Sequence, residues 1–204
     1  MVVAPKFSIA EKAMDLFQRC GLRACTMEDV SRELAISKKT LYKFFSNKTE
    51  LVDESVRAFF TRHTQRIEEI TGKSTNALDE IMKIHAFVLE VMKGNGPVMI
   101  FAMRKYYPET HQWLMEHRKE FVIRQVTANI KRGISEGLYR SDLPVEQVVW
   151  HHYLHLVAAI DMEILPKHLF SNPEFLEYGM HSFVRSIVSE KGRQFLMQNN
   201  STLI

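Results

Sequence analysis

The sequence contains no uncharged apolar run long enough to cross a membrane and no secretory signal at its N-terminus. These absences favour a soluble, cytoplasmic protein with no membrane partner. Cysteine is also scarce, with only Cys20 and Cys25 among 204 residues. We expect both thiols to be reduced and structurally ordinary, and a redox switch is the alternative.

Motifs for catalysis are missing as well. The chain has no Gly-x-Ser-x-Gly sequence, no phosphate-binding loop and no paired Glu-x-x-His arrangement. We therefore predict that it is not an enzyme and that it uses no cofactor. His151 and His155 are four residues apart, a spacing that can place two imidazoles on one metal ion. Because no third ligand follows at a diagnostic spacing, we predict no metal site and favour histidines paired across a dimer interface.

Alternating strand patterns are absent too, and apolar residues recur at helical spacing almost throughout the chain. This pattern predicts an all-α fold of about nine helices. The expected helices cover residues 7–20, 27–34, a short segment from 37, 47–70, 74–92, a short segment from 97, 108–137, 144–165 and 173–190.

The chain does contain a compact motif between residues 26 and 51 with three signals for the start of a helix. Thr26 with Asp29, Ser37, and Asn47 with Glu50 are placed to satisfy the free backbone N–H groups of a first helical turn. Between the first two signals there is room for only about two turns of helix, which is too short to be stable without packing. The spacing predicts two short helices joined by a tight turn.

The second short helix carries Lys38, Lys39, Thr40, Tyr42 and Lys43 on a face that nothing requires to be buried. Such a helix suits the major groove of DNA, where N-terminal side chains reach base edges while lysines and hydroxyls hold phosphates. A solvated lysine face on an ordinary helical hairpin is the alternative interpretation.

Charge supports the DNA-binding interpretation. The segment that ends at Lys48 has nine basic and five acidic residues, whereas the rest of the chain has 18 basic and 19 acidic residues. The net positive charge is therefore concentrated where phosphate neutralisation would need it.

Two stretches of the motif resemble the N-terminal signature of the TetR family of transcriptional regulators. They are residues 30–45, VSRELAISKKTLYKFF, and residues 47–51, NKTEL. The resemblance implies a helix-turn-helix DNA-binding domain in residues 1–50, with the helix from Asn47 connecting onward. It implies a helical ligand-binding and dimerisation domain in residues 51–204.

Carried over by position, the resemblance implies DNA contacts from eight residues of the motif. They are Thr26, Ser37, Lys38, Lys39, Thr40, Tyr42, Lys43 and Lys48. The sequence departs from the family at Leu34, where a small residue is usual, and at Ala35, where the turn usually has glycine. If this turn residue needs a positive φ, alanine costs about 1 kcal/mol relative to glycine.

The helix expected over residues 144–165 is apolar on nearly all sides, which indicates burial on nearly all sides. In a chain of this size that suggests a partner surface, and the final helix supplies a second one. The resemblance implies the same arrangement, because TetR-like regulators dimerise through their last two long helices. We predict a homodimer with the interface residues Val149, Tyr153, Val157, Met180, Phe183 and Ile187.

The middle of the chain is rich in methionine, phenylalanine and bulky aliphatic residues. In the family, a small molecule enters a cavity among the middle helices and changes the separation of the two DNA-reading heads. We predict an apolar effector and a pocket that includes His85, Met99, Met103, Trp113 and Phe121, with plain core as the alternative for each.

These features together predict a ligand-responsive transcriptional regulator. It would be a repressor that binds a palindromic double-stranded DNA operator as a dimer and is released by an unidentified small molecule. A regulator that acts without a small ligand and a helical protein-interaction adaptor are the alternatives. Strongly salt-dependent binding to duplex DNA would separate a regulator from an adaptor.

Overall fold

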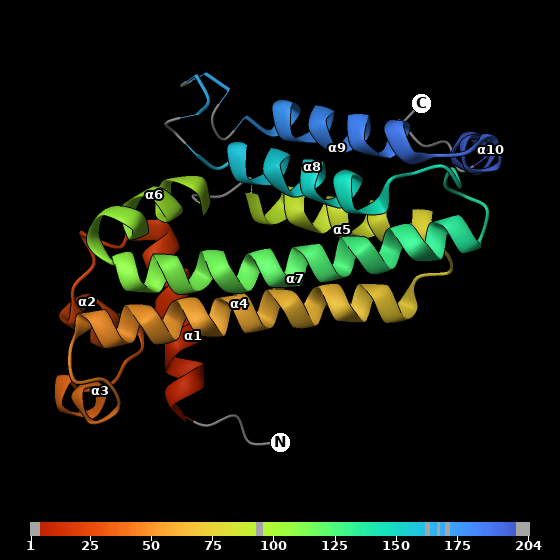
Figure 1. The fold of residues 1–204 in the computed structure, drawn as a ribbon. Coiled ribbons are helices and arrows are strands. Elements are labelled where there is room, and N and C mark those ends of the chain that lie inside the picture. The colour runs from red at the N-terminus through yellow and green to blue at the C-terminus, as the bar shows by residue number, and fades with distance from the viewer. Residues whose placement is uncertain (1–4, 93–95, 162–163, 167, 170–171, 199–204) are drawn as a thin grey trace. The chain divides into compact units, whose positions relative to one another are not determined.

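The computed structural model describes residues 5–92, 96–161, 164–166, 168–169 and 172–198, and ten α-helices lie within these ranges (Figure 1). The predicted all-α fold is confirmed. None of the described helices is both long and apolar enough to span a membrane. The helices are α1 (Pro5–Cys20), α2 (Met27–Glu33), α3 (Lys38–Phe44), α4 (Lys48–Lys73), α5 (Ala77–Met92), α6 (Gly96–Tyr106), α7 (Pro108–Ser135), α8 (Val145–Ala158), α9 (Pro173–Ile187) and α10 (Glu190–Gln198).

The final predicted helix, over residues 173–190, corresponds to α9 and ends three residues earlier in the structure, and α10 follows it unpredicted. α9 ends at Ile187 because Val188 has an extended backbone and forms an antiparallel bridge with Tyr139. Two further backbone bonds hold this crossing, from Arg140 N to the Ile187 carbonyl and from Ser189 N to the Leu138 carbonyl, each 3.0 Å long. The crossing depends on residues distant in sequence, so the local apolar pattern gave no sign of the break before α10.

Two other helix limits differ from the prediction. Ser74 does not cap α5, since its hydroxyl donates to the Ile70 carbonyl at 2.7 Å and so closes the end of α4. The cap of α5 is Asn76, whose Oδ1 accepts from Asp79 N at 2.9 Å. α8 ends at Ala158 and not near residue 165, because tight turns with backbone bonds between residues three apart follow it.

The described chain forms two compact units. The first comprises the described residues of 1–66 and 94–117, and the second those of 67–93 and 118–204. α4 and α7 each run from one unit into the other without a break. The division into domains at residue 50 stays a prediction.

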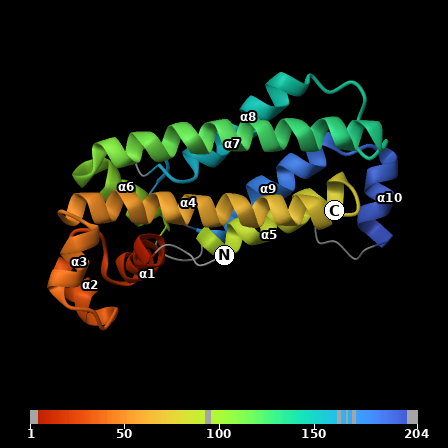
Figure 2. The same cartoon turned by 90° about the horizontal axis from the view of Figure 1, so that it is seen from below.

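The first unit is built around a single apolar core. Figure 2 shows α1, α2 and α3 gathered at the start of α4, and α6 contributes buried methionines to the same cluster. Removal of this apolar surface from water holds the two short helices in place, which their own propensity could not do. The core includes the fully buried side chains of Phe17, Leu41, Phe45, Leu51 and Met103.

The second unit has its own core, in which α5 packs against α9 and α8 lies beside α9 (Figure 1). After α7 the chain turns so that the ring of Tyr139 covers Gly133, where an added Cβ would lie 2.1 Å from a ring carbon. The buried Tyr139 hydroxyl lies 3.0 Å from the Ala77 carbonyl and 2.9 Å from Asn129 Oδ1. Arg132 pairs with the buried Glu80 at 2.9 Å and ties the same end of α7 to α5.

Candidate nucleic-acid interface and apolar cavity

The start of α2 is fixed by the predicted reciprocal cap. Thr26 Oγ1 accepts from Asp29 N at 3.1 Å, and Asp29 Oδ2 accepts from Thr26 N at 2.9 Å. The Thr26 hydroxyl also donates to Asp29 Oδ2 at 2.7 Å, and these bonds lower the pKa of the Asp29 carboxyl. Both side chains are thus held within the motif, and the negative charge lies at the favourable end of the helix.

The turn between α2 and α3 passes through Ala35, whose φ is +52°. No other non-glycine residue in the described ranges has a positive φ. Backbone bonds close the turn, from Ala35 N to the Arg32 carbonyl at 3.1 Å and from Ile36 N to the Ser31 carbonyl at 3.0 Å. The turn residue therefore does adopt the positive φ considered in the sequence analysis, and that residue is alanine.

Ser37 caps α3 as predicted. Its hydroxyl oxygen accepts from Thr40 N at 3.0 Å and lies 2.8 Å from Thr40 Oγ1. Leu41, which is fully buried, anchors the opposite side of the helix in the core of the first unit. The cap and the anchor together fix which face of α3 points outward.

The outward face of α3 is basic. Lys39, Tyr42 and Lys43 are exposed, with Tyr42 at 50%, and none forms a hydrogen bond or ion pair with another residue of the described chain. We call these three residues the recognition surface. Lys38 is exposed as well, but its Nζ donates to Glu28 on α2 at 2.8 Å. That bond lowers the pKa of Glu28 and holds Lys38 against the motif.

Lys48 is also engaged within the protein. Its Nζ donates to the Arg23 carbonyl at 3.0 Å, and burial lowers the pKa of its ammonium group. This bond ties the first residue of α4 to the turn before α2. The residue thus has a structural role beside the predicted phosphate contact, which stays a prediction.

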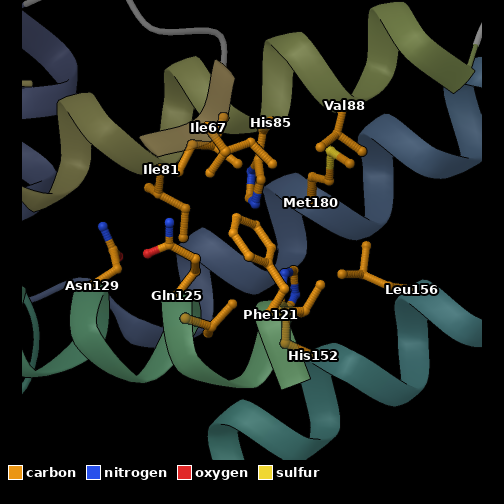
Figure 3. Close-up of a pocket in the computed structure, with 13 residues that line it drawn as sticks. Ile67, Ile81, His85, Val88, Phe121, Gln125, Asn129, His152, Leu156 and Met180 are labelled. Carbon is orange, nitrogen blue, oxygen red and sulfur yellow. The ribbon is translucent and has the colours of Figure 1, made fainter. Parts of the chain in front are cut away.

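The second unit contains an apolar cavity of about 80 Å³ among α5, α7 and α8, with walls from α4 and α9 (Figure 3). Four polar side chains, those of His85, Gln125, Asn129 and His152, reach it. No lining residue is an acid, a lysine or an arginine. Most of the wall is aliphatic or aromatic, including Ile67, Ile81, Val88, Phe121, Leu156 and Met180.

Two of the five predicted pocket residues, His85 and Phe121, line this cavity. Met99, Met103 and Trp113 do not, and their assignment to an effector pocket stays a prediction. Both methionines are buried in the core of the first unit, and Trp113 packs against that core. Their apolar character showed that they would be buried, but not in which of two cores.

The sequence analysis did not assign His152 to the pocket, although it lines the cavity. It singled out His151 and His155 on the same helix, of which the first is exposed and the second half-buried. A usable signal was present, because Val149, His152 and Leu156 follow one another at spacings of three and four and so share a helical face. No group of three or more possible metal ligands occurs in the described part of the chain.

Burial determines the charge of the cavity histidines. It lowers the pKa of His85 to about 3, with a smaller effect from the nearby His181. Burial also lowers the pKa of His152 well below its ordinary value, and His85 adds to the effect. Both imidazoles are therefore neutral near pH 7. Burial likewise raises the pKa of the Cys25 thiol to about 11, and both cysteines are free.

Four of the predicted interface residues cannot form a surface. Val149, Met180, Phe183 and Ile187 are buried within a single chain, so their assignment to a dimer contact is corrected. Tyr153 and Val157 are half-buried. The apolar residues that α8 and α9 do expose are Trp150, Leu154 and Tyr178. Apolar spacing identified the helices but could not separate the side turned to the core from the side turned outward.

The capped turn, the exposed basic helix and the helical second unit define a helix-turn-helix DNA-binding regulator. Comparison with known proteins agrees. Residues 9–55 match the family model for bacterial regulatory proteins, tetR family. Residues 9–55 therefore carry the DNA-binding domain of the TetR family of transcriptional regulators.

Relatives of known sequence support this assignment. The chain is 28% identical over 145 residues to the HTH-type transcriptional repressor KstR2 of Mycobacterium tuberculosis, covering 69% of this chain and 72% of that repressor. It is 24% identical over 147 residues to the HTH-type transcriptional regulator YhgD of Bacillus subtilis, covering 67% and 73%.

Solved structures share the fold. The ketosteroid transcriptional regulator KstR2 of Mycobacterium tuberculosis aligns with a TM-score of 0.59 at 20% identity, covering 93% of this chain and 98% of that one. A TetR transcription regulator from Haloarcula marismortui aligns with a TM-score of 0.74 at 16% identity, covering 92% and 100%.

Proposed function

We propose that the protein is a dimeric repressor that acts in the cytoplasm without catalysing a reaction. It binds a palindromic DNA operator through α3 and releases it when a small molecule occupies the cavity of the second unit. The observation that carries the DNA-binding part is the recognition surface, where two lysines and a tyrosine are exposed and unpaired on a capped helix. Such groups can hold phosphates and reach base edges in the major groove.

A dimer would supply the second reading head. Two copies of α3 about one helical turn of DNA apart would read two half-sites in successive major grooves, which explains why the operator is expected to be palindromic. Trp150 and Leu154 on α8 and Tyr178 on α9 offer the partner an exposed apolar surface. We propose that this surface, and not the buried residues beside it, forms the contact.

The effector part of the proposal is supported by the cavity and by helix continuity. Phe121 and Gln125 of α7 and Ile67 of α4 line the cavity, and the same two helices begin in the first unit. A ligand that shifts either helix therefore acts on an element of the DNA-binding unit. Its effect on DNA affinity equals the difference in its own affinity for the two conformations.

The effectors named for related proteins do not transfer directly. A regulator from Saccharomonospora viridis was solved in complex with choline, which is a cation. The cavity of this chain has no acidic residue to pair with a cation. The KstR2 relative is described as a ketosteroid regulator, and a cavity of about 80 Å³ holds only a fragment of a fused ring system. The size and lining of the cavity therefore determine which effector fits this chain.

The DNA-binding proposal is tested with the Lys39→Ala, Lys43→Ala double variant and with Tyr42→Ala. Operator DNA is first selected from a random pool with the unmodified protein. Both variants should bind it more weakly, because each loses groups that are free to contact the duplex. In the double variant the slope of log affinity against log salt should fall in magnitude by about two, one for each lost phosphate contact.

Lys131→Ala is the matched control, because it removes an exposed lysine from α7 in the second unit. It should leave the affinity and the salt slope unchanged. If the recognition-surface variants bind like the control, α3 is not the DNA-reading helix. If no duplex is selected at all, the result favours a helical protein-interaction adaptor. If DNA binds but no compound releases it, a regulator without a small ligand is favoured.

A further inference from the structure

His85 and His152 face each other inside the apolar cavity, from α5 and α8 (Figure 3). Their ring centroids are 5.7 Å apart. The His152 ring stacks on Phe183, with a centroid distance of 3.8 Å and an interplanar angle of 23°, which fixes its plane. The cavity therefore holds two imidazoles in set positions among aliphatic walls.

His152 has a polar atom with nothing to bind. Its side chain is only 4% exposed, and its Nδ1 is buried without a hydrogen-bond partner. A buried polar group left unpaired costs about 1 to 3 kcal/mol, so such groups in folded proteins normally have a partner. An occupant of the cavity that bonds to this atom would recover that free energy.

The neighbouring polar groups show what kind of occupant fits. Asn129 is already engaged, since its amide donates to the Ala77 carbonyl at 2.9 Å and its Oδ1 accepts from Tyr139. Gln125 forms no hydrogen bond with any described residue and can serve a second polar atom of a ligand. Neutral imidazoles and an amide can each donate or accept, so they suit hydroxyl and carbonyl groups.

Charge and size restrict the occupant further. A charged group buried without a counter-ion is strongly disfavoured. The lining contains no acidic residue, lysine or arginine that could serve as a counter-ion to a charged ligand. The volume of about 80 Å³ is below the roughly 150 Å³ of an engineered cavity that binds benzene. A ligand larger than a few heavy atoms must therefore displace a flexible side chain, for which Met180 is suited.

We propose that the cavity binds the end of an uncharged, mainly apolar ligand whose hydroxyl or carbonyl oxygen is hydrogen-bonded to His152. The inference rests on the proposed function only in that this ligand would be the effector. Binding to the cavity is measured without DNA, so its failure is distinct from failure of the DNA-binding proposal.

Three probes with the same ring test the chemistry: methylcyclohexane, cyclohexanol and cyclohexanecarboxylate, each titrated into the full chain at pH 7.5. Histidine side-chain nitrogen resonances report contact with His152. Cyclohexanol should shift the His152 nitrogen signals and bind about fivefold to tenfold more tightly than methylcyclohexane, the usual gain from one buried hydrogen bond. The carboxylate should bind most weakly, because its charge would be buried without a partner.

The variant His152→Phe keeps a flat ring on Phe183 but removes both nitrogens. It should bind cyclohexanol more weakly than methylcyclohexane, because the hydroxyl would then be buried without a hydrogen-bond partner. His151→Phe, which changes the exposed neighbour, should retain the preference for the alcohol. The nitrogen shifts of the unmodified protein give a second readout that does not depend on how a variant folds.

Several outcomes would overturn the proposal. Tightest binding by the carboxylate would show that a cation anchors the ligand, for which Arg118, one turn before Val122 on α7, is available. Equal affinity for the alcohol and the hydrocarbon, unchanged His152 signals, or a preference that survives in His152→Phe would each remove the assigned anchor. Failure of all three probes to bind would do the same.

Discussion

Ala35 holds the turn between α2 and α3 in a backbone conformation that residues with a Cβ rarely adopt. The strain is tolerated because the backbone bonds of Ala35 and Ile36 close the turn, while Val30 and Leu41 are buried on either side of it. The turn sets the angle between α2 and α3. Its geometry therefore decides how the recognition surface is presented.

Replacing Ala35 with glycine should raise the free energy of unfolding by about 0.5 to 1 kcal/mol. The gain comes from removing the steric conflict at positive φ, less the greater chain entropy of glycine when unfolded. Urea unfolding followed by circular dichroism measures the change.

Ala128→Gly is the control, because it makes the same substitution at an exposed position within α7. There glycine should be destabilising by about 1 kcal/mol. If both variants lose stability by the same amount, the left-handed turn stores no strain.

Single residues explain which parts of the site could be read from the sequence. The caps at Thr26 and Ser37 are local, since their partners lie three residues away, and the structure has both. The partners of Lys38 and Lys48 lie ten and 25 residues away, and no spacing rule indicates them. The Nδ1 of His152 is unpaired only because of how three helices meet, which sequence spacing cannot show.

At the scale of the element, α7 ends where the chain folds back on it. The Tyr139 ring lies against Gly133 in the last turns of the helix, and its hydroxyl reaches the Ala77 carbonyl at the start of α5. A side chain at position 133 would occupy the place of the ring. Glycine is needed there for space and not for backbone freedom.

Gly133→Ala should lower the free energy of unfolding by about 1 to 3 kcal/mol, because the new methyl group displaces a packed ring. Gly72→Ala is the counterpart in α4, where nothing lies within 4 Å of the added Cβ. It should stabilise by about 0.5 to 1 kcal/mol through helix propensity. Thermal unfolding of both variants measures the two changes in stability. Equal shifts of the melting temperature in the same direction would contradict the packing argument.

Helices of this chain were predictable where apolar spacing and a local cap agree, as for α2, α3 and α4. Helix ends were harder to predict where pairing with residues distant in sequence determines them. The extended backbone at Val188 that separates α9 from α10 is held by Leu138, Tyr139 and Arg140, some fifty residues earlier. Met99 and Met103 lie in the core of the first unit and do not line the cavity, which their local apolar pattern could not indicate.

At the scale of the whole molecule, the outer surface of α8 and α9 bears on assembly. Trp150, Leu154 and Tyr178 expose large apolar side chains, which a partner copy would cover. Leu154→Lys should therefore raise the dimer dissociation constant at least tenfold, since the lysine charge would have to be desolvated at the contact. Sedimentation at a series of concentrations measures this.

Val98→Lys is the control, because Val98 on α6 is 54% exposed and Leu154 is 60% exposed. The control should sediment like the unmodified protein. Identical behaviour of the two variants would place the contact elsewhere.

The continuity of α4 and α7 has a consequence for how the molecule loses its structure. Each helix is a single ladder of backbone hydrogen bonds that serves both units. Melting the part of either helix that belongs to one unit would fray the hydrogen-bond ladder that continues into the other unit. We therefore expect the two units to unfold in one cooperative transition, although each has a core of its own.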